Sequence, residues 1–179
     1  ASVCAVIVVG SLYKLIQLSS GGRAVAESLG GRPLNVINAN ADEKKILKDF
    51  SNLLDTHFKQ PQHVLCGHNA KEFDIPFIAR RMIINQITIP QKLNLFGKKP
   101  WEIPHLDTLE LWKFGDYKHF TSLKLMCKVL GIPSPKGDID GSQVGHVFYV
   151  DKDIDRIVTY CEKDTIAVAQ IFLRLRHED

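Results

Sequence analysis

Near the C-terminus, apolar residues recur at helical spacing, and the stripe they form contains one aspartate. The stripe runs through Ile157, Cys161, Asp164, Val168 and Ile171, in steps of four, three, four and three residues. This spacing predicts a helix that turns one face toward a core. Burying an unpaired carboxylate costs free energy, so we expect Asp164 to have a cation, a metal ion or strong hydrogen-bond donors as partners.

Elsewhere, short apolar runs rich in β-branched residues alternate with longer amphipathic segments. The runs predict strands at residues 3–9, 12–18, 34–37 and 63–66, with the end of another at 106–108. The amphipathic segments predict a helix capped by Asn40 and further helices at residues 74–85, 109–112, 121–131, 143–148 and from about 151 onward. Strands that come first and then alternate with helices indicate a three-layer α/β fold with a mixed sheet, in one domain spanning residues 1–179.

Composition narrows the class of protein only slightly. The net charge of +3 permits a nucleic-acid partner but does not argue for one. The four cysteines are scattered, without a Cys-x-x-Cys pair, which favours reduced core thiols in a cytosolic protein over a zinc site. The longest apolar run, residues 3–9, is too short to span a bilayer, and no signal peptide is recognisable. We therefore expect a cytoplasmic protein without a membrane partner.

A second acidic residue follows a buried strand. After a Gly-His-Asn turn, Asp74 begins a helix whose inner face continues through apolar residues. Domains of the α/β class usually place ligands at the C-terminal ends of their strands. Two structural interpretations stay open: Asp74 is also compatible with a helix N-cap, since Pro76 follows, and Asp164 with a carboxylate paired with an arginine or a backbone amide.

Taken together, the two inward-facing carboxylates indicate metal chemistry. Mg²⁺ and Mn²⁺ prefer oxygen ligands, usually a few carboxylates together with water and substrate phosphate. Two such ions ~4 Å apart can stabilise both the attacking and the leaving oxygen in phosphodiester cleavage. Tyr160 lies one helical turn before Asp164, where it is placed to orient the attacking water.

The order and spacing of these residues resemble a known nuclease pattern. Asn69-x-x-x-Phe73-Asp74, followed by Tyr160-x-x-x-Asp164, resembles the second and third exonuclease motifs of the DEDD superfamily of 3′–5′ exonucleases, in its DEDDy branch. The similarity to the proofreading domains of family B DNA polymerases is carried by residues 66–77, 105–108, 121–132 and 160–164. As a whole, the chain is most similar to stand-alone, predicted polymerase-B-like exonucleases of bacteria.

This resemblance implies a fold, a cofactor and a reaction. The fold is RNase H-like, with a central mixed β-sheet flanked by helices, and four carboxylates hold two Mg²⁺ or Mn²⁺ ions. Asp74 and Asp164 would be metal ligands, and Tyr160 would position the nucleophilic water. Asn69 and Phe73 would line the cleft near the terminal nucleotide. The implied activity is hydrolysis of phosphodiester bonds at the 3′ end of single-stranded or frayed DNA.

One motif of the family does not occur in residues 1–179. This motif is Asp-x-Glu on the first central strand. Residues 3–9 look like the family's second strand, so the first strand is expected upstream of Ala1 or is absent. Loss of a central strand would expose two sheet edges, which favours the former explanation. The alternative is a catalytically inactive nuclease-fold module that binds nucleic acid or a protein partner.

Further residues have two interpretations each. Asp107 is either a replacement metal ligand or a residue that orders its loop or caps the next helix. His105 has the same ambiguity between a ligand and a hydrogen-bonded core residue. Arg80 and Arg81 are adjacent. Either they both reach a phosphate group, or one of them pairs with a carboxylate. Aromatic residues interleaved with lysines at 96–124 suit a track for single-stranded nucleic acid, and equally a packed aromatic cluster.

Overall fold

The computed structural model describes residues 43–116, 118–134 and 139–178, and the structural statements below concern these residues. The strands predicted at 3–9, 12–18 and 34–37, and the helix cap at Asn40, lie outside them. In chain order, the described elements are α2 (Glu43–His57), β1 (Cys66–Gly67), α3 (Asp74–Ile84), η1 (Gln91–Leu93), η2 (Pro100–Glu102), β2 (Leu106–Asp107), α4 (Thr108–Lys113), α5 (Leu123–Val129), α6 (Val144–His146), η3 (Val147–Asp151) and α7 (Ile154–Leu175).

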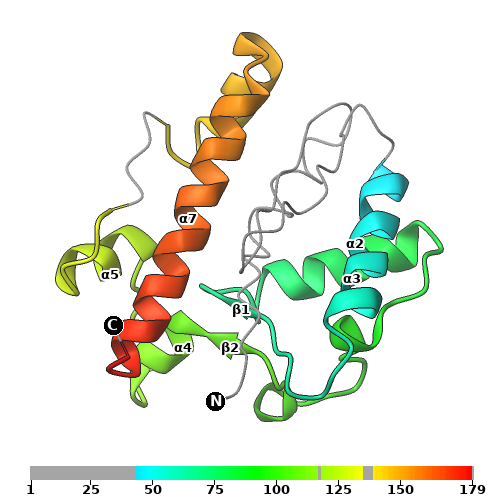
Figure 1. Cartoon of the computed structure of the whole chain (residues 1–179), viewed down its shortest axis with the longest axis horizontal. Helices are drawn as coiled ribbons and strands as arrows, with labels where there is room; N and C mark the ends of the chain where they lie inside the picture. Colours follow the sequence, from blue (N-terminus) through cyan, green and yellow to red (C-terminus); the bar gives the residue numbers. More distant parts are fainter. Residues whose placement is uncertain (1–42, 117, 135–138, 179) are drawn as a thin grey trace.

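Strands β1 and β2 form a two-stranded parallel ladder in the middle of the described part (Figure 1). The register pairs Cys66 with Leu106 and Gly67 with Asp107. The strand predicted at residues 63–66 is therefore shorter and lies further toward the C-terminus than expected. One physical reason is that the amide of Leu65 donates to the side chain of His105, 3.2 Å away, and so takes no part in the ladder.

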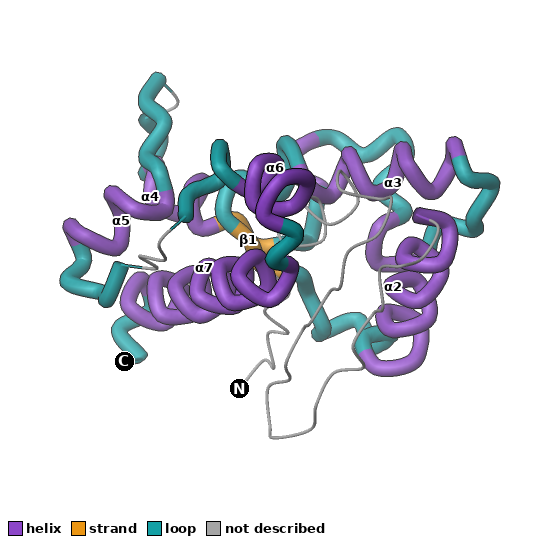
Figure 2. Tube along the Cα trace, turned by 90° about the horizontal axis from the view of Figure 1, so that it is seen from above, coloured by secondary structure: helices purple, strands orange, loops and turns teal. Residues whose placement is uncertain are grey.

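Helices cover both faces of this ladder. Successive residues of an extended chain point to opposite faces. Leu65 accordingly packs in a cluster with α2 and α3, whereas Cys66 packs against Val168 and Phe172 of α7. Figures 1 and 2 both show the ladder between the α2–α3 pair on one side and α7 with α4 and α5 on the other. The described part is helix-rich with a small parallel sheet, which is compatible with the predicted α/β class.

The apolar faces of α2 and α3 pack against each other as their periodicity predicts. The buried residues of this cluster are Ile46, Leu47, Phe50, Leu54, Leu65, Ile75, Ile78, Met82 and Leu93. At its edge, the guanidinium group of Arg81 donates two hydrogen bonds to the carboxylate of Glu43. The interpretation that one of the two adjacent arginines pairs with a carboxylate is thus confirmed for Arg81.

Side-chain caps fix the starts of the later helices. Ser122 accepts from the amide of Leu125 at the start of α5, and Asp153 accepts from the amide of Arg156 at the start of α7. The short helix predicted at residues 143–148 is α6 followed by the π-helix η3. None of the helices in the described part of the chain is long and apolar enough to cross a membrane.

Candidate active site

The C-terminal ends of β1 and β2 lie side by side, and polar residues follow both. β1 continues into a turn that covers residues 68–73 and leads to α3, and β2 ends at Asp107. α7 crosses the same region, because Val168 packs against Cys66 and Asp164 precedes Val168 by one helical turn. Since α/β proteins bind ligands at this edge of a sheet, we take it as the candidate active site.

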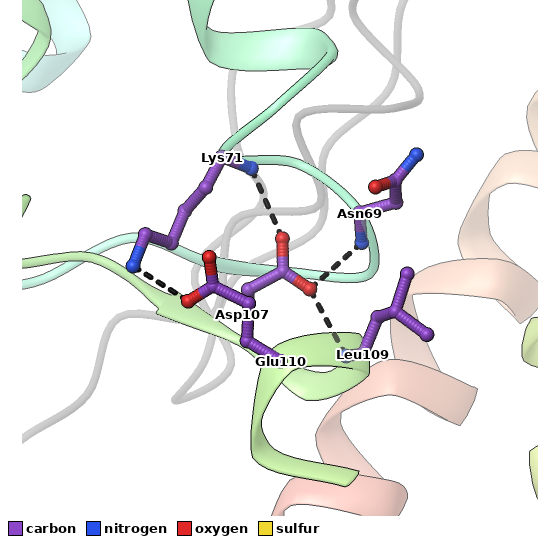
Figure 3. Close-up of polar contacts among 5 residues, drawn as sticks. All are labelled: Asn69, Lys71, Asp107, Leu109 and Glu110. Carbon is purple, nitrogen blue, oxygen red and sulfur yellow. Dashed lines mark hydrogen bonds and ion pairs between the residues drawn. The ribbon is translucent and has the colours of Figure 1, made fainter. Parts of the chain in front are cut away.

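The carboxylate of Asp107 holds the turn after β1 in place. Asp107 is 2% exposed and accepts three backbone N–H groups (Figure 3). Its Oδ1 accepts from Asn69 at 2.8 Å and from Leu109 at 3.0 Å, and its Oδ2 accepts from Lys71 at 3.0 Å. Asp107 therefore caps α4 and orders the neighbouring loop, which confirms the structural one of its two predicted roles.

An ion pair attaches the same turn to α4 a second time. Nζ of Lys71 lies 2.6 Å from Oε2 of Glu110, and the side chain of Lys71 is only 10% exposed. A pair shielded from water is screened less by solvent than one on an open surface. Figure 3 shows the ammonium group and the backbone amide of Lys71 reaching the β2–α4 segment in different directions. The turn therefore has two separate attachments to that segment.

Gly67 allows the turn to close tightly. A Cβ atom at this position would lie 2.3 Å from the Cβ of Ala70, far inside the normal contact distance of two carbon atoms. Two residues further on, Asn69 has a left-handed backbone with a φ of 60°, which asparagine adopts more readily than most residues. The Gly-His-Asn sequence thus supplies the conformations that lead the chain from β1 toward α3.

His68 joins this turn to the segments that start α4 and precede α5. Its Nδ1 lies 3.0 Å from Oγ1 of Thr108, and its Nε2 lies 2.9 Å from the carbonyl oxygen of Thr121. The pKa of His68 is lowered, because burial outweighs the opposing effects of the Thr121 carbonyl and the carboxylates of Asp107 and Asp164. The carbonyl oxygen of Thr121 can only accept, so Nε2 of His68 donates to it, while the Thr108 hydroxyl, which also donates to the carbonyl oxygen of Gly67 at 3.2 Å, lies against Nδ1.

Asp164 and Asp74 belong to different helices. Asp164 is half-buried in the middle of α7, and its negative charge acts on His68 and on Cys127. Burial raises the pKa of the Cys127 thiol, and Asp164 raises it further. Asp74 is 6% exposed and is the first residue of α3. The chain already has a helical backbone at Phe73, which occupies the N-cap position, so the prediction that Asp74 caps this helix is wrong.

The remaining predicted site residues differ in their exposure. Tyr160 is half-buried against the cluster around Ile157, and its hydroxyl oxygen lies 3.8 Å from the position that a Cβ would take at Gly141. Asn69 is half-buried in the turn, and Phe73 is 50% exposed just before α3. Within the described ranges, no three His, Cys, Asp or Glu side chains come together in a metal-binding group.

His105 is a structural residue. Its Nδ1 accepts from the amide of Leu65, and its Nε2 donates to the carbonyl oxygen of Lys92 at 2.7 Å. Burial lowers the pKa of His105, so the ring is neutral at pH 7 with its proton on Nε2. The interpretation of His105 as a hydrogen-bonded core residue is therefore confirmed.

Comparison with protein families gives one match that spans nearly the whole chain. Residues 13–179 match a family described as a predicted 3′–5′ exonuclease related to the exonuclease domain of PolB. The chain belongs to this family. Membership confirms the resemblance to polymerase-B-like exonucleases, and it indicates an enzyme of the nuclease kind with a nucleic-acid substrate. No curated protein and no solved structure gives a significant match.

For this member of the PolB-related family, the sequence motifs do not single out His68, although its side chain joins three segments at this edge of the sheet. His68 hydrogen-bonds to residues from two other segments and senses the charge of Asp164. The available signal was its place directly after a buried strand, between a glycine and an asparagine. That signal gives a location but no partner, because Thr108 and Thr121 are distant in sequence.

Proposed function

We propose that this protein is a metal-dependent 3′–5′ exonuclease that hydrolyses phosphodiester bonds at the 3′ end of single-stranded or frayed DNA in the cytoplasm. The proposal includes a three-layer RNase H-like fold with a central mixed sheet. Its main support, in a chain of this family, is the position of Asp164. The charge of this carboxylate, in the middle of α7, acts on His68, the residue that follows β1, and Val168 one helical turn later packs against Cys66 of β1.

In this proposal, Asp74 and Asp164 bind Mg²⁺ or Mn²⁺, with two ions per site expected. The donor set fits such ions, because Mg²⁺ is commonly bound by one or two carboxylates together with water and substrate phosphate. When bound, these ions generate a nucleophile from water and stabilise charge on the phosphate. Tyr160 orients the attacking water, and Asn69 and Phe73 contact the terminal nucleotide. Exonuclease domains of this kind usually use divalent metals.

A degradation assay on end-labelled single-stranded DNA with Mg²⁺ or Mn²⁺ tests this function. Asp164→Ala should lower the rate by about 100-fold or more, an effect typical of misplaced reacting groups. Tyr160→Phe should slow hydrolysis less than Asp74→Ala or Asp164→Ala. Asp155→Ala is a matched control, because Asp155 is an exposed aspartate in the first turn of the same helix. Equal residual activity in wild type and Asp164→Ala would refute the proposal.

A second candidate is a nuclease-fold module without catalytic activity. Its specific support is that residues 1–179 contain no Asp-x-Glu pair. Titration calorimetry with Mn²⁺ separates the two candidates, because a module without metal sites should show no specific uptake. Uptake that is lost in both Asp74→Ala and Asp164→Ala would favour the enzyme.

A further inference from the structure

An exposed aromatic side chain is attached to the candidate active site through His68. Phe120 is 65% exposed, and its ring meets the ring of His68 edge to face, with centroids 6.3 Å apart and an interplanar angle of 71°. The next residue, Thr121, accepts a hydrogen bond from the same imidazole. The backbone and the ring of this segment are thus both fixed to the turn after β1, while much of the phenyl surface faces solvent.

The partner of this ring lies close to the proposed chemistry. His68 precedes Asn69, and its pKa responds to the carboxylates of Asp107 and Asp164. Phe120 therefore contacts the residue, His68, on which the charge of the proposed metal ligand Asp164 acts. Because Phe120 is 65% exposed, most of its ring surface remains open to a ligand at this edge of the sheet.

The segment around Phe120 carries a net positive charge. Residues 113–128 contain four lysines and one aspartate, a net charge of +3. The side chains of Lys118, Lys124 and Lys128 are exposed. Proteins that bind single-stranded nucleic acid combine such charge, which attracts the phosphate backbone, with aromatic rings on which bases stack.

We propose that Phe120 stacks on a base of the single-stranded nucleic acid whose 3′ end occupies the candidate active site. This inference rests on the proposed function, because it needs a strand at that edge of the sheet. The base supplies the flat apolar face that Phe120 leaves exposed, and the contact between Phe120 and His68 fixes how far that base lies from the site. Stacking is independent of the sugar, so a DNA strand and an RNA strand offer the same chemistry.

Fluorescence anisotropy with a short labelled oligothymidine tests this stacking, with Ca²⁺ in place of Mg²⁺ so that binding is measured without hydrolysis. Phe120→Ala should weaken binding by about 10-fold, the usual scale for losing one base–aromatic stack. Phe120→Trp should bind at least as tightly as wild type. Tyr149→Ala is the matched control, because Tyr149 lies outside residues 96–124, is 59% exposed, and its ring also meets a neighbouring ring, that of Phe148, edge to face. It should change binding by less than about twofold, as a surface substitution outside the contact.

A substrate with one abasic nucleotide, moved through the positions next to the 3′ end, identifies the stacked base. In wild type, one abasic position should weaken binding about as much as Phe120→Ala does. In Phe120→Ala, that position should have no further effect. A parallel series with oligouridine tells whether RNA is held in the same way.

The outcomes separate this inference from the proposed function. Equal binding by wild type and Phe120→Ala, an equal loss in Tyr149→Ala, or abasic losses that persist in Phe120→Ala would each overturn the stacking role, even if wild type degrades DNA. Binding that depends on Phe120 in a protein that degrades no DNA would support the stacking role and refute the proposed function. A wild-type protein that binds neither strand would overturn both.

Discussion

Replacement of Asp107 tests whether one buried carboxylate holds the turn at the candidate active site. The carboxylate accepts the amides of Asn69, Lys71 and Leu109 and is almost fully buried. In Asp107→Ala, all three amides lose this acceptor. In Asp107→Asn, the amide oxygen can keep the place of Oδ1 with its two donors, while the NH₂ group faces the amide of Lys71.

The contacts set the expected loss of stability. Hydrogen bonds to charged groups contribute about 1.5–3 kcal/mol each, and loss of a helix N-cap alone costs about 1 kcal/mol. Because losses at one carboxylate are not additive, we expect Asp107→Ala to lower the free energy of unfolding by about 3–5 kcal/mol. Asp107→Asn loses one acceptor and keeps two bonds, so its cost should be about 1–2 kcal/mol.

Urea unfolding followed by far-ultraviolet circular dichroism measures both losses. Asp153→Ala is the matched control, because Asp153 is also an aspartate N-cap but is exposed and accepts one amide, that of Arg156 at 3.1 Å. Its expected cost is about 1 kcal/mol. Equal slopes of free energy against urea concentration across the variants would show that the same unfolding transition is being compared.

Two results would refute this reasoning. If Asp107→Ala costs no more than Asp153→Ala, the two additional amides of the turn contribute nothing to stability. If Asp107→Asn is as unstable as Asp107→Ala, the two hydrogen bonds to Oδ1 that the asparagine oxygen can keep do not contribute to the free energy of unfolding.

Two further substitutions test the packing and the electrostatics near this turn. Gly67→Ala should destabilise the fold by about 1–3 kcal/mol, the usual cost of overpacking, because its Cβ would meet that of Ala70. The double variant Gly67→Ala/Ala70→Gly removes the Cβ of Ala70, so its thermal unfolding midpoint should recover part of the loss. A midpoint as low as that of Gly67→Ala would show that the strain arises from another contact. Burial lowers the pKa of His105 below its unfolded value of about 6.5, so its stabilising contribution is complete above that pH and is lost as the pH falls through the lower folded-state pKa. The urea midpoint should therefore fall between about pH 7.5 and 5.5 more steeply in wild type than in His105→Gln, and parallel profiles would contradict a neutral buried ring.

The sequence predicts the helices better than the strands for a physical reason. The stripe through Ile157 and Ile171 identifies α7, because helical periodicity is a local signal that extends over several turns. The extent of β1 depends on what its amides and carbonyls meet elsewhere in the chain. The amide of Leu65 meets the side chain of His105, 40 residues away, and no pattern within the strand reveals this.

The same distinction applies to the candidate site. The carboxylates Asp74 and Asp164 stand out in the sequence because each interrupts a core-facing apolar stripe. For Asp107 the sequence leaves two possible roles, a metal ligand or a structural residue. It does not decide between them, because the partners Asn69 and Lys71 lie 38 and 36 residues away in the chain. The expectation that Asp74 is an N-cap followed from a local rule, and it failed because the chain already has a helical backbone one residue earlier.

The contacts of Asp107 also affect which charge the turn after β1 can bind. Successive backbone N–H groups beside a left-handed residue form a concave nest that commonly binds phosphate and other anions. Here Asn69 is left-handed, and the N–H groups of Asn69 and Lys71 both donate to the carboxylate of Asp107. The anion-binding capacity of the turn is therefore satisfied from within the protein.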